Sequence, residues 1–194
     1  MWKKPNREHG KNELLKIRNE QLFSLEMSET VHKAQKQNVG NAGEYYIAAR
    51  LSALDFTATI TLGRAEKYDI LALSPSGRLV KISVKATQNE SATDFPLSAK
   101  DENGAADDFY YAFVKLNGFA KEPDFWIIPS KIVCPLIRDA HKKWETTPGR
   151  NNETHGISSV RILPIELRGS QKIYYPAKWE NEVKKYYRNL KQLL

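Results

Sequence analysis

An acidic and a basic residue stand at the two ends of one predicted hairpin, in the segment KYDILALSPSGRLVKISVKATQ of residues 67–88. Asp69 opens the first strand and Lys85 closes the second, although both strands are otherwise made of residues that favour burial. An ionised side chain on a buried strand costs free energy unless a partner or a ligand uses its charge. Carboxylates suit magnesium, which activates water beside a phosphate, and a nearby lysine can assist proton movement. The pair is therefore a candidate metal site.

The alternation of side chains along the second strand sets which groups share a face. In RLVKISVKA one face carries Val80, Ile82, Val84 and Ala86, and the other carries Leu79, Lys81, Ser83 and Lys85. A connection with an odd number of residues places Asp69 opposite Ser83 and diagonal to Lys85, within reach of a shared ligand. An even connection without a bulge sends Asp69 to the other face.

Glu44 is a third candidate, carried by a predicted helix that precedes the hairpin. It stands three, four and seven residues before apolar positions of that helix, which are Ile47, Ala48 and Leu51. It therefore lies on the core-facing stripe, where a carboxylate needs a partner. Asn41 and Glu44 have the N-cap and N3 spacing of a capping box, and a metal site shared with Asp69 is the alternative. The spacing alone does not choose between them.

The elements that must position these groups follow from hydrophobic periodicity and turn signals. Pro75 and Gly77 suit the second and fourth positions of a type I turn between the hairpin strands. In chain order the sequence predicts a helix over 38–56, a strand over 57–62, the hairpin, a loop or weak helix over 88–107, buried strands over 108–116 and 124–130, a helix over 130–144, an edge strand over 160–167 and an amphipathic helix over 177–194. This order predicts an α/β fold around a mixed sheet.

Composition limits the class of protein. The 194 residues carry 41% hydrophobic residues and a formal charge of +7, which suits one globular domain with a polyanionic partner such as nucleic acid. We expect one domain over 37–194, preceded by a polar helical arm over 1–36. The single cysteine, Cys134, excludes an internal disulfide and a thiolate zinc cluster. No apolar run reaches membrane-spanning length and no signal peptide is present, so we expect a cytoplasmic protein without a membrane partner.

Three segments in a fixed order resemble a known family. GEYYIAARLSALDF, KYDILAL and ISVKATQ are similar to motifs of the PD-(D/E)XK nuclease superfamily, especially its resolvase-like and restriction-endonuclease-like members. The resemblance covers about residues 40–130. It implies a restriction-endonuclease-like core of α-β-β-β-α-β order, with a mixed central sheet and flanking helices. It also implies an endonuclease that hydrolyses DNA with Mg²⁺ or Mn²⁺.

The resemblance also implies a role for each matching residue. Asp69 would be the central metal ligand, Glu44 would support the metal or its waters, and the carbonyl of Val84 would add a ligand. Lys85 would hold the attacking water or stabilise charge that develops on the phosphate. Gln88 would orient the substrate.

Ser83 departs from the family pattern, because the family usually carries Glu or Gln there and serine is a poor magnesium ligand. Three interpretations follow. Glu44 and Asp69 complete a two-acid site, or the site has lost cleavage and kept binding, or a migrated acid substitutes, the candidates being Glu66, Glu90 and Asp94. We favour the two-acid site, because all three ionisable groups are present together.

Weaker candidates for contact with nucleic acid are Gln88, Lys142, Lys143, Arg150, His155 and Arg161. A solvated helix face and loop explain most of these residues equally well, because they form no clean basic stripe. The alternative function is a catalytically inactive module on the same fold that binds nucleic acid or another protein. The sequence leaves the oligomeric state open, a homodimer included.

Overall fold

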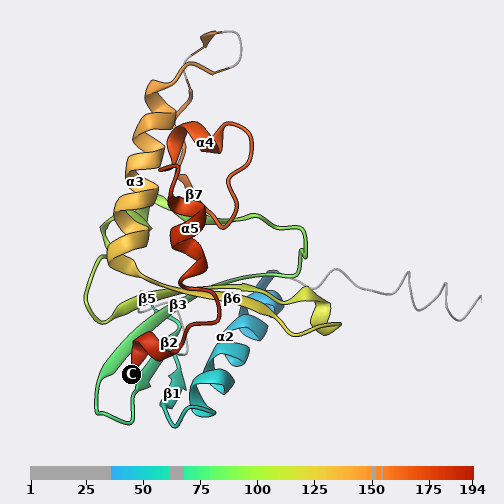
Figure 1. The fold of residues 1–194 in the computed structure, drawn as a ribbon, viewed down its shortest axis with the longest axis vertical. Helices are drawn as coiled ribbons and strands as arrows, with labels where there is room; N and C mark the ends of the chain where they lie inside the picture. Colours follow the sequence, from blue (N-terminus) through green and yellow to red (C-terminus); the bar gives the residue numbers. More distant parts are fainter. Residues whose placement is uncertain (1–35, 62–67, 150–151, 154) are drawn as a thin grey trace, which may run out of the picture. The chain divides into compact units, whose positions relative to one another are not determined.

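The computed structural model describes residues 36–61, 68–149, 152–153 and 155–194 (Figure 1). Residues Gln37–Leu194 form one compact unit. The predicted arm lies outside the described residues except for its last residue, Lys36. None of the described helices is long and apolar enough to cross a membrane.

A mixed five-stranded sheet forms the centre of the unit, with helices on its two faces, and this confirms the predicted α/β class. Its strand order is β1-β2-β3-β5-β6; β3 and β5 are parallel and the other neighbours are antiparallel. The elements are α2 (Lys36–Ser52), β1 (Thr57–Ile60), β2 (Ile70–Leu73), β3 (Leu79–Thr87), β4 (Asp94–Ser98), η1 (Ala99–Asn103), β5 (Phe109–Lys115), η2 (Asn117–Phe119), β6 (Asp124–Pro129), α3 (Ser130–Thr146), β7 (Val160–Pro164), α4 (Gln171–Tyr174), α5 (Trp179–Lys184) and η4 (Lys191–Leu193).

The central strand β5 is buried on both sides and divides the apolar interior in two. Alternate residues of β5 face opposite ways, so Tyr110 and Ala112 join one cluster and Tyr111 and Phe113 join the other. The first cluster packs beneath α2, and the second packs beneath α3, α5 and the small β4–β7 sheet. The predicted double cover of this strand is thus confirmed.

The hairpin turn has the predicted geometry. The backbone N–H of Gly77 donates to the carbonyl of Ser74 at 2.9 Å, which closes a turn with Gly77 in its fourth position. Gly77 has a φ of +83°, a conformation that glycine adopts without steric penalty. The register pairs Leu73 with Leu79, so five residues, 74–78, connect the strands and the connection is odd.

Two segments differ from the sequence prediction. Part of the expected loop over 88–107 forms β4, whose buried Phe95 and Leu97 pair with β7 and cover the second apolar cluster. The final helix ends at Lys184 instead of running on to the C-terminus.

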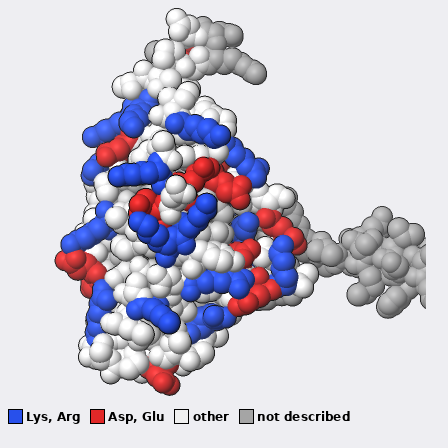
Figure 2. Space-filling view, in the orientation of Figure 1, with Lys and Arg blue, Asp and Glu red and all other residues white. Residues whose placement is uncertain are grey.

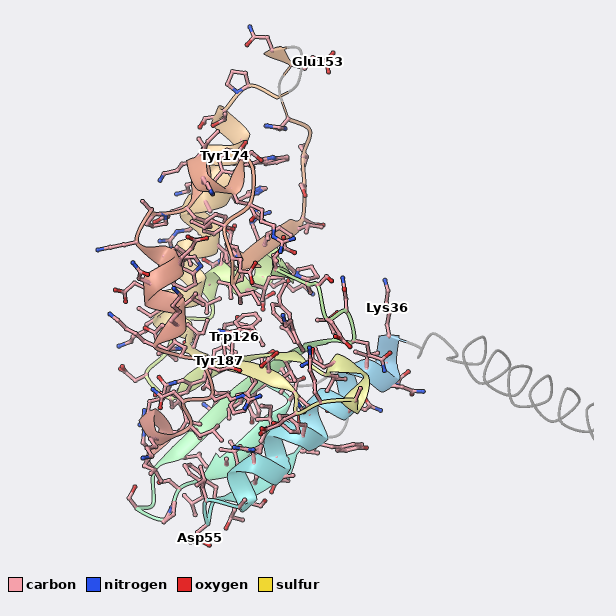
Figure 3. All side chains as sticks on the ribbon, turned by 45° about the vertical axis from the view of Figure 1, so that its right-hand side comes forward. Lys36, Asp55, Trp126, Glu153, Tyr174 and Tyr187 are labelled. Atoms are coloured by element: carbon pink, nitrogen blue, oxygen red, sulfur yellow. The ribbon has the colours of Figure 1, made fainter. Side chains whose placement is uncertain are left out.

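The chain after α5 runs along the edge of β6 as an extra strand would. Ile127 N–H donates to the Tyr186 carbonyl at 3.1 Å, and Arg188 N–H donates to the Phe125 carbonyl at 2.9 Å. Figure 3 labels Trp126 and Tyr187, whose ring centroids lie 5.4 Å apart at this edge. Pairing an open edge satisfies backbone groups that a continued helix would leave exposed, which explains the early end of the helix.

Candidate functional site

Asp69 lies where the β2–β3 ladder stops. The register pairs Ile70 with Ile82 and so places Asp69 opposite Ser83, as the odd connection predicts. Its Oδ2 accepts hydrogen bonds from Val84 N–H at 2.6 Å and from the Ser83 hydroxyl at 3.2 Å. The carboxylate thus replaces the backbone acceptor that a longer β2 would have supplied. This is a strand-capping role, and it uses one of the two carboxylate oxygens.

Glu44 lies on helix α2 and is influenced by the charge of Asp69. The helix spans Lys36–Ser52, so Asn41 lies in its interior and cannot be the N-cap of a capping box with Glu44. Burial raises the pKa of Glu44, the negative charge of Asp69 raises it further, and the positive charge of Lys85 works in the opposite direction. Glu44 is therefore close enough to Asp69 and Lys85 for each to act on it.

The hydrogen bond to Val84 sets the position of the Asp69 carboxylate relative to the two faces of the sheet. A strand N–H lies in the plane of the sheet, so the Asp69 carboxylate sits in that plane, at the end of β2. Glu44 approaches from the α2 face, and strand alternation assigns Lys85 to the opposite face. Because the N–H and C=O of one strand residue point to the same side, the Val84 carbonyl is directed toward Asp69 as well.

Lys85 differs from the other lysine on its face of β3. Lys81 lies 3.0 Å from Asp108 and 5.9 Å from the centre of the Tyr68 ring. Within the described ranges, Lys85 is a half-buried residue whose ammonium has neither an ion pair nor a hydrogen bond. A lysine that influences Glu44 without an ion pair among the described residues keeps its ammonium donors available for a water or a phosphate.

The donor set fits a hard divalent cation. Glu44 and Asp69 repel each other where a cation would hold both, and the Val84 carbonyl offers a third oxygen. The part of the chain that the structure describes contains no group of three or more His, Cys, Asp or Glu side chains suited to a metal. A metal here would therefore keep several waters, which is normal for magnesium.

The two substitute acids that the structure describes have partners of their own. Glu90 pairs with Lys121 at 3.2 Å, and Asp94 accepts from Gln171 at 2.9 Å. Glu66 lies outside the described residues. Ser83 is only 4% exposed and bonded to Asp69, so it orients the carboxylate instead of replacing the acid expected at its position.

The predicted contacts with nucleic acid are scattered. Gln88 is exposed just beyond β3, and Lys142 and Lys143 are exposed on α3. His155 stacks on Trp144 with ring centroids 4.1 Å apart. Figure 2 shows lysines and arginines mixed with acids over the face that it draws, without a continuous basic stripe.

Two arginines of the predicted nucleic-acid contact remain to be placed, Arg161 and Arg150. The guanidinium of Arg161 is buried, pairs with Glu102 and donates to the Ser158 carbonyl at 2.9 Å. We therefore leave Arg161 out of the site, because its hydrogen-bonding groups are already engaged. Arg150 lies outside the described residues.

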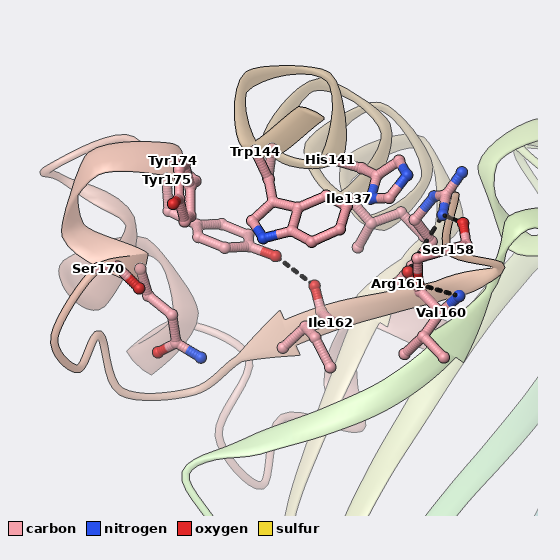
Figure 4. A pocket seen from close by; sticks show the side chains of 12 residues that line it. Ile137, His141, Trp144, Ser158, Val160, Arg161, Ile162, Ser170, Tyr174 and Tyr175 are labelled. Atoms are coloured by element: carbon pink, nitrogen blue, oxygen red, sulfur yellow. Dashed lines mark hydrogen bonds between the residues drawn. The ribbon is translucent and has the colours of Figure 1, made fainter. Parts of the chain in front are cut away.

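A separate pocket of about 310 Å³ lies between α3, β7 and α4 (Figure 4). Trp144, Tyr174 and Tyr175 supply aromatic walls, and the Tyr175 hydroxyl donates to the Ile162 carbonyl. Neither the two acids nor Lys85 lines it, so it is distinct from the candidate metal site. The sequence did not predict this pocket, because its walls come from segments that only tertiary folding brings together.

Replacing Ser83 by alanine is expected to lower the free energy of unfolding by about 1 kcal/mol, the usual net value of one hydrogen bond. The substitution removes the hydroxyl that donates to Asp69 Oδ2 while Val84 N–H still holds that oxygen. Urea unfolding measures the difference. Ser91→Ala, at an exposed position, is the matched control, and an equal effect in both variants would contradict the positioning role of Ser83.

Replacing Glu44 by glutamine is expected to change two quantities in opposite directions. The metal-free protein should melt at a slightly higher temperature, because a half-buried charge near Asp69 is removed. Magnesium affinity, measured by isothermal titration, should fall by about tenfold or more. Glu90→Gln, which breaks only an exposed pair with Lys121, should leave both quantities near the wild-type values.

No protein-family model matches the chain, and no curated protein matches it at a significant level. Among solved structures, the bacterial homing endonuclease I-Ssp6803I is similar, with a TM-score of 0.42 and 14% sequence identity. The match covers 78% of this chain and 94% of that chain. A similarity of this size does not carry an activity over, so the function must be argued from the residues of the site.

Proposed function

We propose that the protein is a metal-dependent nuclease that hydrolyses phosphodiester bonds in DNA at a PD-(D/E)XK-type centre. One observation carries the proposal. The Asp69 carboxylate is held at the end of a strand by Val84 N–H, within electrostatic reach of Glu44, which Lys85 also influences. This arrangement supports a site shared by two acids and a lysine from three separate segments of the chain.

Each residue has a defined task in this proposal. Asp69 and Glu44 hold the cation together with the Val84 carbonyl, and Ser83 fixes the orientation of Asp69. When bound, Mg²⁺ or Mn²⁺ supplies a Lewis acid that lowers the pKa of a water and neutralises charge on the phosphate. Lys85 holds the attacking water by a hydrogen bond and stabilises the charge that grows on the phosphate oxygens.

The charge of the chain supports a polyanionic substrate. A formal charge of +7 attracts nucleic acid over distances longer than any single contact. With DNA as the substrate, we place the protein in the cytoplasm.

The test is cleavage of supercoiled, nicked and branched DNA by the wild-type protein. We expect cleavage with Mg²⁺ or Mn²⁺, none with EDTA, and recovery when excess Mg²⁺ is added back. Cleavage that persists in EDTA would contradict the metal-dependent mechanism.

A non-cleaving module that binds nucleic acid is the second candidate, and Ser83 favours it because an acid is missing where the family carries one. This candidate predicts DNA binding that chelator does not change, with no cleavage under any of the metal conditions. The nuclease predicts cleavage that depends on the cation and on Asp69.

A further inference from the structure

Gly43 occupies an unusual position for a glycine. It is buried in the interior of α2, where glycine destabilises a helix relative to alanine. A β-carbon added to Gly43 would lie 2.5 Å from the β-carbon of Ala86 and 3.3 Å from Val84 Cγ1. Real β-carbons do not approach this closely, so the helix lies against β3 at a distance that only glycine allows.

Both the helix side and the strand side of this contact lie next to residues of the candidate site. On the helix, Gly43 is followed by Glu44. On the strand, Val84 and Ala86 flank Lys85, and Val84 N–H holds the Asp69 carboxylate. The separation of α2 from β3 at this contact therefore sets how far the Glu44 carboxylate lies from Asp69 and Lys85.

We propose that Gly43 and Ala86 are positioning residues, which bring Glu44 within ligand distance of a cation on Asp69 by allowing the helix backbone to touch β3. The inference rests on the proposed function. Shared ligation of a small cation demands placement within about half an ångström. A methyl group at Gly43 would displace the helix by more than this, because the β-carbon opposite it belongs to a strand in the middle of the sheet and cannot rotate away.

The helix contains its own control. Gly40 lies three residues earlier in α2, and an added β-carbon there would meet nothing within 4 Å. Gly40→Ala therefore makes the same chemical change without touching the sheet. Ala86→Gly offers the complementary change, because it removes the β-carbon with which the new methyl group of Gly43→Ala would collide.

The experiment measures the rise in melting temperature of the full chain as Mg²⁺ is added, which reports binding to the folded state without requiring catalysis. We expect Gly43→Ala to raise the half-saturating Mg²⁺ concentration by at least about tenfold, in the range seen when residues that support metal ligands are changed. Gly40→Ala should stay near the wild-type concentration. Gly43→Ala combined with Ala86→Gly should recover most of the loss.

Other results would overturn the inference. These are a normal Mg²⁺ response in Gly43→Ala, an equal loss in Gly40→Ala, or a double variant no better than Gly43→Ala alone. If Gly43→Ala does not fold, Ala86→Val fills the same contact from the strand and is expected to show the same loss, and a normal response there would overturn the inference. Absence of any Mg²⁺ response in the wild-type protein would overturn the proposed function too, which separates the two failures.

Discussion

Replacement of Asp69 by asparagine is expected to reduce the rate of metal-dependent DNA cleavage by at least about 1,000-fold. A bound metal ion supplies several kcal/mol of charge stabilisation in the transition state, and each 1.4 kcal/mol or so corresponds to a factor of ten in rate. Asparagine removes the charge that holds the cation. Single-turnover cleavage of a labelled duplex measures the loss.

Asparagine is the informative substitution at this position. Asp69 Oδ2 accepts hydrogen bonds from Val84 N–H and the Ser83 hydroxyl, and the amide oxygen of asparagine can accept both. Alanine would leave the buried Val84 N–H without an acceptor, which costs about 1–3 kcal/mol of stability and would mix folding with catalysis. The unfolding transition of Asp69→Asn should therefore stay close to that of the wild-type protein.

Asp108→Asn is the matched control for this experiment. Asp108 is also an acid beside β3, but it pairs with Lys81 at 3.0 Å in a half-exposed ion pair. Such pairs contribute little to stability. Cleavage by Asp108→Asn should stay near the wild-type rate, and an equal loss in both variants would mean that general charge, not the Asp69 site, drives the activity.

Replacement of Lys85 by methionine is expected to slow cleavage by about 100- to 10,000-fold, the range attributed to a well-placed general acid or base. Methionine keeps most of the length and apolar stem of lysine and removes its charge. Lys85 also offsets the mutual repulsion of Glu44 and Asp69, so its removal should leave Mg²⁺ affinity unchanged or slightly higher. Loss of rate with retained metal binding distinguishes Lys85 from the two carboxylates.

Lys81→Met provides the matched control on the same strand and the same predicted face. Lys81 lies beside Asp108 and Tyr68, two residues along β3 from Ser83. Its substitution should change cleavage less than threefold or so, as expected for a half-exposed ion pair. If Lys81→Met and Lys85→Met lose the same activity, the lysines act through substrate attraction and not through the reacting water.

The hairpin was predictable from the sequence because its geometry is set locally. Pro75 and Gly77 fix the turn, and an odd connection then forces Asp69 opposite Ser83. The hydrogen bond between these two side chains follows directly from that register. The sequence therefore limited Asp69 to two alternatives, and the register of the hairpin selects the one opposite Ser83.

Features that depend on distant segments were not predictable. Gly40 and Asn41 indicate a helix start in the sequence, yet α2 begins at Lys36 and continues through both residues to pack Gly43 against β3. The strand β4 was missed because its partner, β7, lies more than 60 residues along the chain. The helical pattern after Lys184 was overridden by the open edge of β6.

The predicted basic surface also depended on distant segments and was not predictable from the sequence. The sequence presents Arg161 as one member of a positive loop, but tertiary folding buries it against Glu102. Charge pairing between residues so far apart in the chain leaves no local signal in the sequence. The surroundings of these basic residues consequently needed the structure, whereas the position of Asp69 opposite Ser83 follows from an odd connection between the hairpin strands.

The most direct measurement is an anomalous difference map from crystals of the wild-type protein soaked in Mn²⁺, collected at a wavelength where manganese scatters anomalously. The predicted result is one strong peak between the Asp69 and Glu44 carboxylates and near the Val84 carbonyl. The peak should be absent from crystals of Asp69→Asn. A map with no peak there, or with manganese bound only elsewhere on the chain, would contradict the metal-dependent nuclease.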